Sequence, residues 1–255
     1  MSTDHPSRFR GRSAIVTGGG AGIGRAIAER LAREGAAVEI WDRDQAALDT
    51  VVGELRKHDP QASGARLDVA DDVAVSGAIT AFCARRKPLD ILIHAAGIVG
   101  PSSTPITAVS LADFERVVRV NLTASFIVTK HAVAAMTPQK YGRVLLFASV
   151  AGKEGNPGMC SYSASKAGVI GLAKAVGKEV AGSGITVNAI APAVIRTPLL
   201  DTVDQKQIDY MTARIPMGRT GTLDEAAALS CWIVSEEASF NTGFTFDLTG
   251  GRATY

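Results

Sequence analysis

Apolar residues occur along this chain in short continuous runs, which alternate with longer stretches where they recur every three or four positions. The short runs predict strands at 13–16, 37–41, 64–67, 89–93, 144–148, 185–190 and 243–248. The longer stretches predict helices at 45–57, 72–85, 111–136, 161–181 and 223–235, with a further helix that ends at Arg33. Strands that alternate with helices in this way indicate an α/β fold, in which helices cover both faces of a parallel sheet.

The length and the apolar content suit one domain. The chain has 255 residues, of which 46% are hydrophobic, and this is enough apolar material for a sizeable core. We therefore expect residues 1–255 to form a single domain. The segment 194–217 contains Pro198 and Pro216 among polar residues, so we interpret it as a mobile substrate lid with short helices.

Charge and cysteine content argue against several classes of protein. The chain has 27 basic and 25 acidic residues without a long basic block, so we expect no nucleic-acid partner. No apolar run approaches the roughly 18 residues of a membrane span, so we expect no membrane partner. Cys83, Cys160 and Cys231 form no C-x-x-C pair and no cluster with histidine. We therefore expect neither disulfides nor a metal site, and we place the protein in the reducing cytoplasm.

A glycine-rich turn follows the first predicted strand. Gly18, Gly22 and Gly24 have the spacing G-x-x-x-G-x-G, and Ile23 stands where the third glycine of a G-x-G-x-x-G turn would fall. Glycines let the backbone adopt positive φ, and the free N–H groups of a helix N-terminus bind anions. We therefore expect this turn, Ile23 included, to bind the pyrophosphate of a dinucleotide.

Asp42 ends the second predicted strand. A carboxylate at this position accepts hydrogen bonds from both ribose hydroxyls and repels a 2′-phosphate, which favours NAD over NADP. Arg43 follows directly and would neutralise a 2′-phosphate, so NADP stays the second candidate. A structural role for Asp42, as the N-cap of the helix that begins near Gln45, is also compatible with the sequence.

Two further strand ends carry residues suited to the nucleotide. Asp68 and Val69 close the third predicted strand, where the acid is placed to meet the adenine. Ala95, Ala96 and Gly97 follow the fourth predicted strand, and their small size lets a ribose pack against the backbone. Because ligands of parallel sheets bind beyond the carboxyl ends of the strands, these groups should gather on one edge.

Tyr162, followed four positions later by Lys166, is the candidate general base. Residues four apart share one face of a helix, so the ammonium would lie beside the phenol and favour its phenolate. Lowering the tyrosine pKa from about 10 by roughly three units would require about 4 kcal/mol. One lysine and a cationic cofactor ring would supply this together. Ser149 follows the apolar run at 144–148, so its hydroxyl is placed to hydrogen-bond a reacting oxygen.

Asn121 interrupts the long helical stretch at 111–136. Asparagine is a poor residue for a helix interior, because its side chain bonds nearby backbone groups. A local break in the helix and an ordinary surface asparagine are both compatible with this position.

Taken in order, these motifs resemble the short-chain dehydrogenase/reductase family. The matching segments are Thr17–Gly24, Ala95-Ala96-Gly97, Asn121, Ser149, Tyr162 with Lys166, and Asn188–Thr197, and the resemblance extends over nearly the whole chain. It implies a doubly wound Rossmann fold with a seven-stranded parallel sheet. It also implies an oxidoreductase that transfers a hydride between NAD and a secondary alcohol or ketone.

The resemblance implies a role for each residue of the motif. Tyr162 is the acid/base, Ser149 polarises the substrate oxygen, and both face the substrate. Lys166 holds the cofactor ribose and tunes the tyrosine, and Asn121 positions a water that relays protons. Further cofactor contacts are implied at Pro192, Ala193, Ile195 and Thr197. Family members assemble as homotetramers through the two long helices, here 111–136 and 161–181, and the terminal segment, and we expect the same of this chain.

Two positions depart from the family pattern. His94 replaces the usual asparagine before Ala-Ala-Gly, which leaves one strand-linking hydrogen bond unaccounted for. A lone histidine at a strand end is more often structural than catalytic, so we expect no catalytic role for it. Ala193 replaces the glycine of the usual Pro-Gly pair and stiffens the loop that meets the nicotinamide. Neither change removes a catalytic group.

Candidate substrate contacts fall into two sets. A polar pocket for a polyhydroxylated substrate or its carboxylate is predicted from five residues: Lys153, Glu154, Asn156, Arg196 and Arg214. An apolar pocket would be lined by Met159, Leu199 and Met211. The stretch at 151–157 and the tail at 250–255 resemble family members that act on sugars, sugar acids such as 2-keto-3-deoxy sugar acids, or polyols.

Two alternative functions stay open. The first is a 3-oxoacyl thioester reductase that acts on acyl-carrier protein with NADPH. Such an enzyme would be expected to show stronger sequence features for NADPH binding, and a basic patch that binds the acidic carrier protein. The second is a non-catalytic dinucleotide-binding sensor, which would typically lack the set of Tyr, Lys and Ser.

Overall fold

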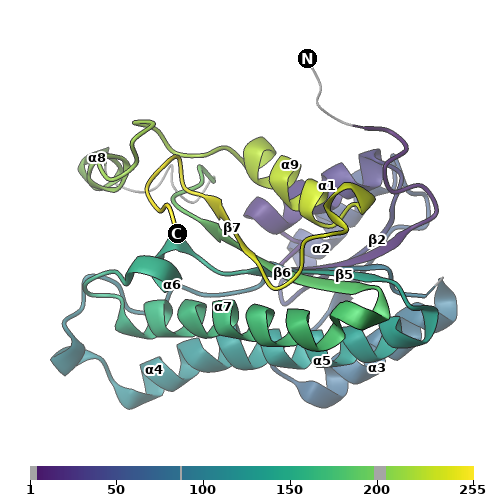
Figure 1. Ribbon diagram of the computed structural model, residues 1–255, viewed down its shortest axis with the longest axis horizontal. Coiled ribbons are helices and arrows are strands. Elements are labelled where there is room, and N and C mark those ends of the chain that lie inside the picture. Colours follow the sequence, from purple (N-terminus) through teal and green to yellow (C-terminus); the bar gives the residue numbers. More distant parts are fainter. Residues whose placement is uncertain (1–4, 87, 198–204) are drawn as a thin grey trace.

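The computed structural model describes residues 5–86, 88–197 and 205–255. Within these residues, seven parallel strands form one sheet in the order β3-β2-β1-β4-β5-β6-β7 (Figure 1). The strands are β1 Ser13–Thr17, β2 Ala37–Asp42, β3 Ser63–Arg66, β4 Ile91–His94, β5 Gly142–Phe147, β6 Ile185–Pro192 and β7 Thr245–Leu248. The expected doubly wound, seven-stranded Rossmann fold is confirmed.

Helices connect the strands. They are α1 Gly22–Arg33, α2 Gln45–Leu55, α3 Asp72–Arg85, α4 Leu111–Val118, α5 Ala124–Met136, α6 Val150–Glu154, α7 Cys160–Val180, α8 Gln205–Thr212 and α9 Leu223–Ile233. A π-helical turn, Arg119–Thr123, connects α4 to α5. Short 3-10 turns lie at Ile106–Ala108, Thr137–Gln139, Ala181–Ser183 and Glu236–Ala238. Across the described ranges, none of these helices has the length and apolar content to span a bilayer.

The core has two halves, one on each face of the sheet. Side chains alternate along a strand, so Ile91 and Ile93 of β4 face the half packed by α1, α2 and α9. Leu92 between them faces the half packed by α3, α5 and α7. Figure 1 shows α1 and α9 above the sheet and α5 and α7 below it. Burial of both faces explains why the strands appear in the sequence as continuous apolar runs.

The register of the strands brings their carboxyl ends to one edge. Thr17, the last residue of β1, pairs with Trp41 of β2 and with His94 of β4. His94 in turn pairs with Leu146 of β5. Because these strands end at nearly the same level, the loops that follow them meet at the edge where doubly wound sheets bind ligands.

Some elements differ from those predicted. α6 has only five residues, too few to show a hydrophobic period, and the sequence pattern missed it. β6 continues through Pro192, which can occupy a strand end because it need not donate an N–H beyond that point. Part of the expected lid, 198–204, lies outside the described residues, together with Pro198 and the apolar candidate Leu199. The short helix α8 follows this part.

Gly177 and Gly53 offer a matched pair of glycine-to-alanine substitutions within helices. A β-carbon on Gly177 of α7 would lie 2.5 Å from the backbone nitrogen of Gly243, whereas one on Gly53 of α2 would meet no atom within 4 Å. We expect Gly177→Ala to lower the free energy of unfolding by about 1–3 kcal/mol, because packed backbone must move apart. Gly53→Ala should raise it by up to about 1 kcal/mol, because alanine restricts the unfolded chain. Urea denaturation checks both values, and shifts of the same sign would contradict this account.

Candidate active site

The hydroxyl of Ser149 interacts with the phenol of Tyr162. Ser149 is the N-cap of α6, and its Oγ accepts from the N–H of Ala151 at 3.1 Å. Tyr162 lies in the first turn of α7, one turn before Lys166. The Nζ atom of Lys166 is 5.8 Å from the centre of the Tyr162 ring. The structure therefore brings together the three residues that the sequence singled out.

Lys166 is a buried cation attached to the sheet. The residue is 5% exposed, and its Nζ donates to the carbonyl oxygen of Phe147 at 2.6 Å. Burial lowers the pKa of this ammonium to about 8, because the charged form is disfavoured away from water. The contact fixes α7 against the end of β5.

The lowering of the Tyr162 pKa that was expected from Lys166 together with a cationic cofactor ring stays a prediction, because burial acts in the opposite direction in the protein by itself. Burial raises the pKa of Tyr162, and the hydrogen bond from Ser149 only partly opposes this rise. The ammonium of Lys166 is bound to Phe147 and does not reverse the effect of burial. Additional positive charge, such as that of an oxidised nicotinamide ring, is needed to favour the phenolate.

Asn121 lies in the π-helical turn and is buried. Its Oδ1 accepts from the N–H of Ile98 at 2.8 Å, and its Nδ2 donates to the carbonyl of Ile98 at 2.9 Å and to Ser165 Oγ at 3.0 Å. Ser165 Oγ donates in turn to the carbonyl of Tyr162 at 2.8 Å. A β-carbon on Gly97 would lie 3.0 Å from Asn121 Oδ1. The alternative of a surface asparagine is wrong, and the expected break is a widened turn that links the loop after β4 to α7.

The glycine turn has the conformation of an anion site. Gly18 and Gly22 have φ values of 66° and 52°, in the left-handed region that favours glycine. A β-carbon on Gly24 would lie 2.1 Å from the carbonyl oxygen of Gly18, so a side chain does not fit there. The side chain of Ile23 packs against the core. Since α1 has no acidic residue in its first turn, its N-terminus is suited to a phosphate.

Asp42 points back toward the glycine turn. One carboxylate oxygen accepts from the N–H of Gly20 at 3.0 Å, and the other accepts from the N–H groups of Arg43 at 2.7 Å and Asp44 at 3.2 Å. The N-cap of α2 is Asp44, whose side chain accepts from the N–H of Ala47. The alternative role of Asp42 as the N-cap is therefore wrong, and its carboxylate is fixed beside the turn.

A hollow of about 620 Å³ opens at the carboxyl ends of β2 and β3, where the adenine was expected. It is lined by Arg43, Asp44, Arg66, Leu67 and Asp68. Asp68 is exposed and accepts from the N–H of Ala70 at 3.0 Å, whereas the side chain of Val69 is buried in the core. The hollow therefore presents both acidic and basic groups to a ligand.

His94 and the two alanines after it tie β4 to the glycine turn. His94 Nδ1 lies 2.7 Å from Thr17 Oγ1, and the N–H groups of Ala95 and Ala96 donate to the carbonyl and hydroxyl oxygens of Thr17 at 3.2 and 3.3 Å. A β-carbon on Gly18 would lie 2.8 Å from the nitrogen of Ala96. His94 thus supplies a hydrogen bond between β4 and β1, in place of the asparagine of the family pattern.

The segment after β6 returns to the glycine turn. The N–H of Ala193 donates to the last residue of β7 at 2.9 Å, and Ile195 is buried and pairs with the segment before α9. Arg196 is exposed. Thr197 lies beside Gly22, since its Cγ2 is 3.7 Å from the position of a β-carbon on that glycine. Of these residues, the structure brings Thr197 to the predicted pyrophosphate site.

The polar substrate candidates that follow Ser149 are in contact with β7 and the end of the chain. Lys153 pairs with Asp247 at 2.8 Å, and Glu154 pairs with Arg252 at 2.7 Å. Asn156 Oδ1 accepts from Arg252 at 2.9 Å. Sequence reasoning missed Asp247 and Arg252, because ion pairs between distant segments leave no local pattern.

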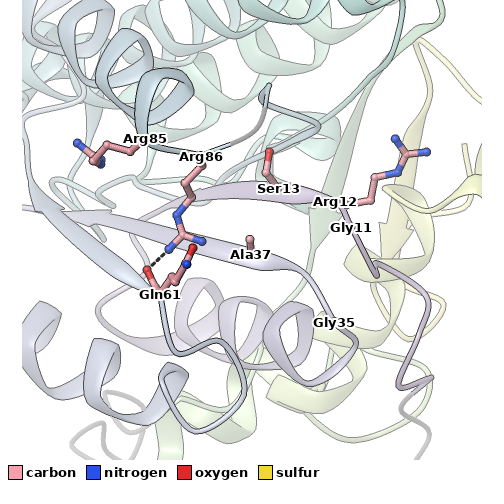
Figure 2. Close-up of a pocket in the computed structure, with 8 residues that line it drawn as sticks. All are labelled: Gly11, Arg12, Ser13, Gly35, Ala37, Gln61, Arg85 and Arg86. Atoms are coloured by element: carbon pink, nitrogen blue, oxygen red, sulfur yellow. Dashed lines mark hydrogen bonds between the residues drawn. The ribbon is translucent and has the colours of Figure 1, made fainter.

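A second hollow, of about 300 Å³, lies at the opposite edge of the sheet (Figure 2). It is lined by Gly11, Arg12, Ser13, Gly35, Ala37, Gln61, Arg85 and Arg86. Each of its three guanidinium groups pairs with a carboxylate on a neighbouring element. Since these charges are neutralised within the protein, we assign the hollow no part in catalysis.

Comparison with known proteins agrees with this geometry. The family model for short chain dehydrogenases matches residues 12–208, and the chain belongs to this family. It is 46% identical over 248 residues to a 2-dehydro-3-deoxy-L-rhamnonate dehydrogenase (NAD(+)) from Sphingomonas sp. (strain SKA58), covering 97% of this chain and 98% of the relative. It is 34% identical over 244 residues to a 3-oxoacyl-acyl-carrier-protein reductase from Thermotoga maritima, covering 96% and 98%. A crystal structure of NAD+-bound xylitol dehydrogenase matches with a TM-score of 0.90 at 30% identity, covering 96% of this chain and 100% of that one.

We expect His94 to make the protein sensitive to acid. Burial and the charge of Lys166 lower the pKa of His94 from 6.5 to about 3, so the unfolded chain takes up a proton that the folded chain refuses. The stability that depends on neutral His94 is therefore complete above about pH 6.5 and is lost as the pH falls toward 3. Between pH 6.5 and 5 the loss reaches up to about 2 kcal/mol. Urea denaturation at pH 7 and pH 5 should show that the free energy of unfolding falls less in His94→Asn than in the parent protein. An equal fall in both proteins would contradict this account.

Proposed function

We propose that this protein is an NAD-dependent dehydrogenase that oxidises a secondary alcohol of a sugar acid, such as a 2-keto-3-deoxy sugar acid. The observation that carries the proposal is the grouping of Ser149 and Tyr162, with Lys166 one turn away, at the same edge as the glycine turn. A non-catalytic sensor would have no need of this set of side chains, which makes it the weaker candidate.

Each residue of the site has its own proposed role in the reaction. Tyr162, as phenolate, would take the proton of the substrate hydroxyl, while Ser149 would hydrogen-bond the same oxygen and stabilise its developing charge. Lys166 would hold the ribose next to the nicotinamide, and Asn121 would position the water that carries the proton onward. When bound, NAD supplies the acceptor for the hydride. Reduction uses the same groups in reverse.

NAD is proposed over NADP because of Asp42, whose carboxylate is fixed at the glycine turn and would repel a 2′-phosphate. The pyrophosphate would lie at the glycine turn and the N-terminus of α1, and the adenine in the hollow beside Asp68. The relative from Sphingomonas and the xylitol dehydrogenase structure both have NAD in their names, which supports this choice. The remaining proposed cofactor contacts are Ile23, Arg43, Val69, Ala95, Ala96, Gly97, Pro192, Ala193, Ile195 and Thr197.

The substrate class is proposed from the relative from Sphingomonas and from polar residues next to the catalytic set. Lys153, Glu154 and Asn156 lie between Ser149 and Tyr162 in the sequence, and Arg196 lies within the segment 194–217 that is interpreted as a lid. The alternative, a 3-oxoacyl-acyl-carrier-protein reductase with NADPH, is supported by a relative at 34% identity, compared with 46% for the sugar-acid dehydrogenase. Asp42 argues against the NADPH that this alternative would use.

We further propose that the protein acts in carbohydrate metabolism in the cytoplasm as a homotetramer. Its three cysteines are unpaired, which suits a reducing compartment. Leu111 of α4 and Phe126 of α5 are 71% and 51% exposed, and apolar side chains at such positions suit a contact between subunits.

A panel of sugar acids, polyols and 3-hydroxyacyl thioesters, each with NAD and with NADP, tests the function through the absorbance of the reduced nicotinamide. We expect turnover of a sugar acid with NAD, and a loss of kcat of about 100- to 10,000-fold in Tyr162→Phe, which lacks the general base. Tyr141→Phe is the matched control, because Tyr141 stacks on Arg12 and Arg143 away from the site. Full turnover by Tyr162→Phe would favour the sensor, and a preference for thioesters with NADPH would favour the reductase.

Light scattering tests the assembly. We expect the parent protein to have the mass of a tetramer, and Phe126→Glu to shift it to smaller species, because a buried charge would oppose the subunit contact. A monomeric mass for the parent protein would refute the proposed assembly.

A further inference from the structure

The C-terminal segment, Thr249–Tyr255, lies against the short helix that follows the candidate catalytic serine. Arg252 is its central contact: Nε and Nη2 lie 2.9 and 2.7 Å from one carboxylate oxygen of Glu154. Nη2 also donates to Asn156 Oδ1 at 2.9 Å, and the Arg252 side chain is only 8% exposed. Hydrogen bonds between charged groups are about twice as strong as neutral ones, so this contact holds the end of α6.

Lys153 is held by the same part of the chain. Its Nζ pairs with Asp247 of β7 at 2.8 Å and lies 4.9 Å from the centre of the Tyr255 ring. The hydroxyl of Tyr255 donates to the carbonyl of Lys153 at 2.5 Å. The last two residues of α6 are therefore both fixed by β7 and the segment after it.

α6 connects this fixed end to the catalytic residues. Ser149 is its N-cap, and a β-carbon on Gly152, in its middle, would lie 2.6 Å from the backbone carbonyl carbon of Lys166. A helix of five residues is not stable alone, so the position of α6 depends on its contacts with the rest of the protein. A shift of α6 at Glu154 would therefore move Ser149 and disturb the packing of α6 on α7.

A second connection runs through the loop between α6 and α7. Asn156, whose side chain accepts from Arg252, donates its backbone N–H to Ser163 Oγ at 3.0 Å. Ser163 follows Tyr162 directly in the first turn of α7. Arg252 therefore contacts α6, which follows Ser149, through Glu154. It is linked to α7, which carries Tyr162, through Asn156.

We propose that Arg252 is a positioning residue, which holds α6 and the following loop so that Ser149 and Tyr162 stay beside each other. The proposal rests on the proposed dehydrogenase function of the same site. Arg252 acts through Glu154 and Asn156. Its loss should change turnover more than cofactor binding, because the glycine turn and Asp42 belong to other elements.

Two variants of Arg252 and one matched control test this role. Arg252→Met removes the charge and keeps the apolar stem, whereas Arg252→Lys keeps the charge and loses the planar fork. Arg86→Met is the control, since the Arg86 side chain, which lines the hollow in Figure 2, is 6% exposed and pairs with Asp59 at the opposite edge of the sheet. Each variant is compared with the parent by kcat, by NADH affinity from fluorescence and by hydrogen exchange with mass spectrometry.

We expect Arg252→Met to lower kcat about 10- to 100-fold with little change in NADH affinity, because small displacements of catalytic groups cost this much. Arg252→Lys should recover part of the loss. Exchange at 149–163 should be faster in Arg252→Met and unchanged in Arg86→Met, which should keep the parental kcat.

The proposal would be overturned if Arg252→Met kept the parental kcat or lost no more kcat than Arg86→Met. Unchanged hydrogen exchange at 149–163 in Arg252→Met would also overturn it. If Arg252→Met does not fold, Arg252→Lys decides by the same measurements. If the parent protein turns over no member of the panel, the proposed function fails, while the exchange at 149–163 still decides whether Arg252 holds α6.

Discussion

The helix that carries Tyr162 is held in place by a buried positive charge. Moving an ammonium out of water is unfavourable, and the short hydrogen bond from Lys166 to the carbonyl of Phe147 offsets part of that cost. Lys166 lies one turn after Tyr162 in α7, and its Nζ binds the last residue of β5, so it attaches the helix to the strand. Ser149 lies just beyond the same strand, so the placement of Ser149 relative to Tyr162 depends on this attachment.

The proposed role of Asp42 in the choice of NAD rests on a carboxylate that is fixed and on neighbouring guanidinium groups that are exposed. The Asp42 carboxylate accepts three backbone N–H groups, so its position is set before a nucleotide arrives. Arg43 and Arg66 are exposed, although Arg66 Nε donates to the carbonyl of Arg43 at 3.2 Å. Water screens exposed guanidinium groups, whereas the carboxylate stands directly at the turn. A preference for NAD is therefore compatible with two arginines close by.

Features with a local spacing could be predicted from the sequence, and features that depend on distant contacts could not. The glycine turn and the Tyr162–Lys166 pair belong to single elements, so their neighbours follow from helix and strand geometry. The raised pKa of Tyr162 depends on burial by the whole fold, which no short pattern records. Arg252 lies 98 positions from Glu154, and only the folded chain shows that they pair. For Asn121 the sequence offered two readings, and the choice required its partners Ile98 and Ser165.

The widened turn between α4 and α5 also fixes the phase of the helix that follows it. A π-helical turn contains one residue more than an α-helical turn, which rotates the following residues by about 100°. Val128, Ala132 and Met136 are fully buried against the sheet in the resulting orientation. Removing one residue from Arg119–Thr123 would turn these side chains away from the sheet or withdraw the amide of Asn121 from α7. The length of this connection is therefore set jointly by the core beneath it and by the site at its end.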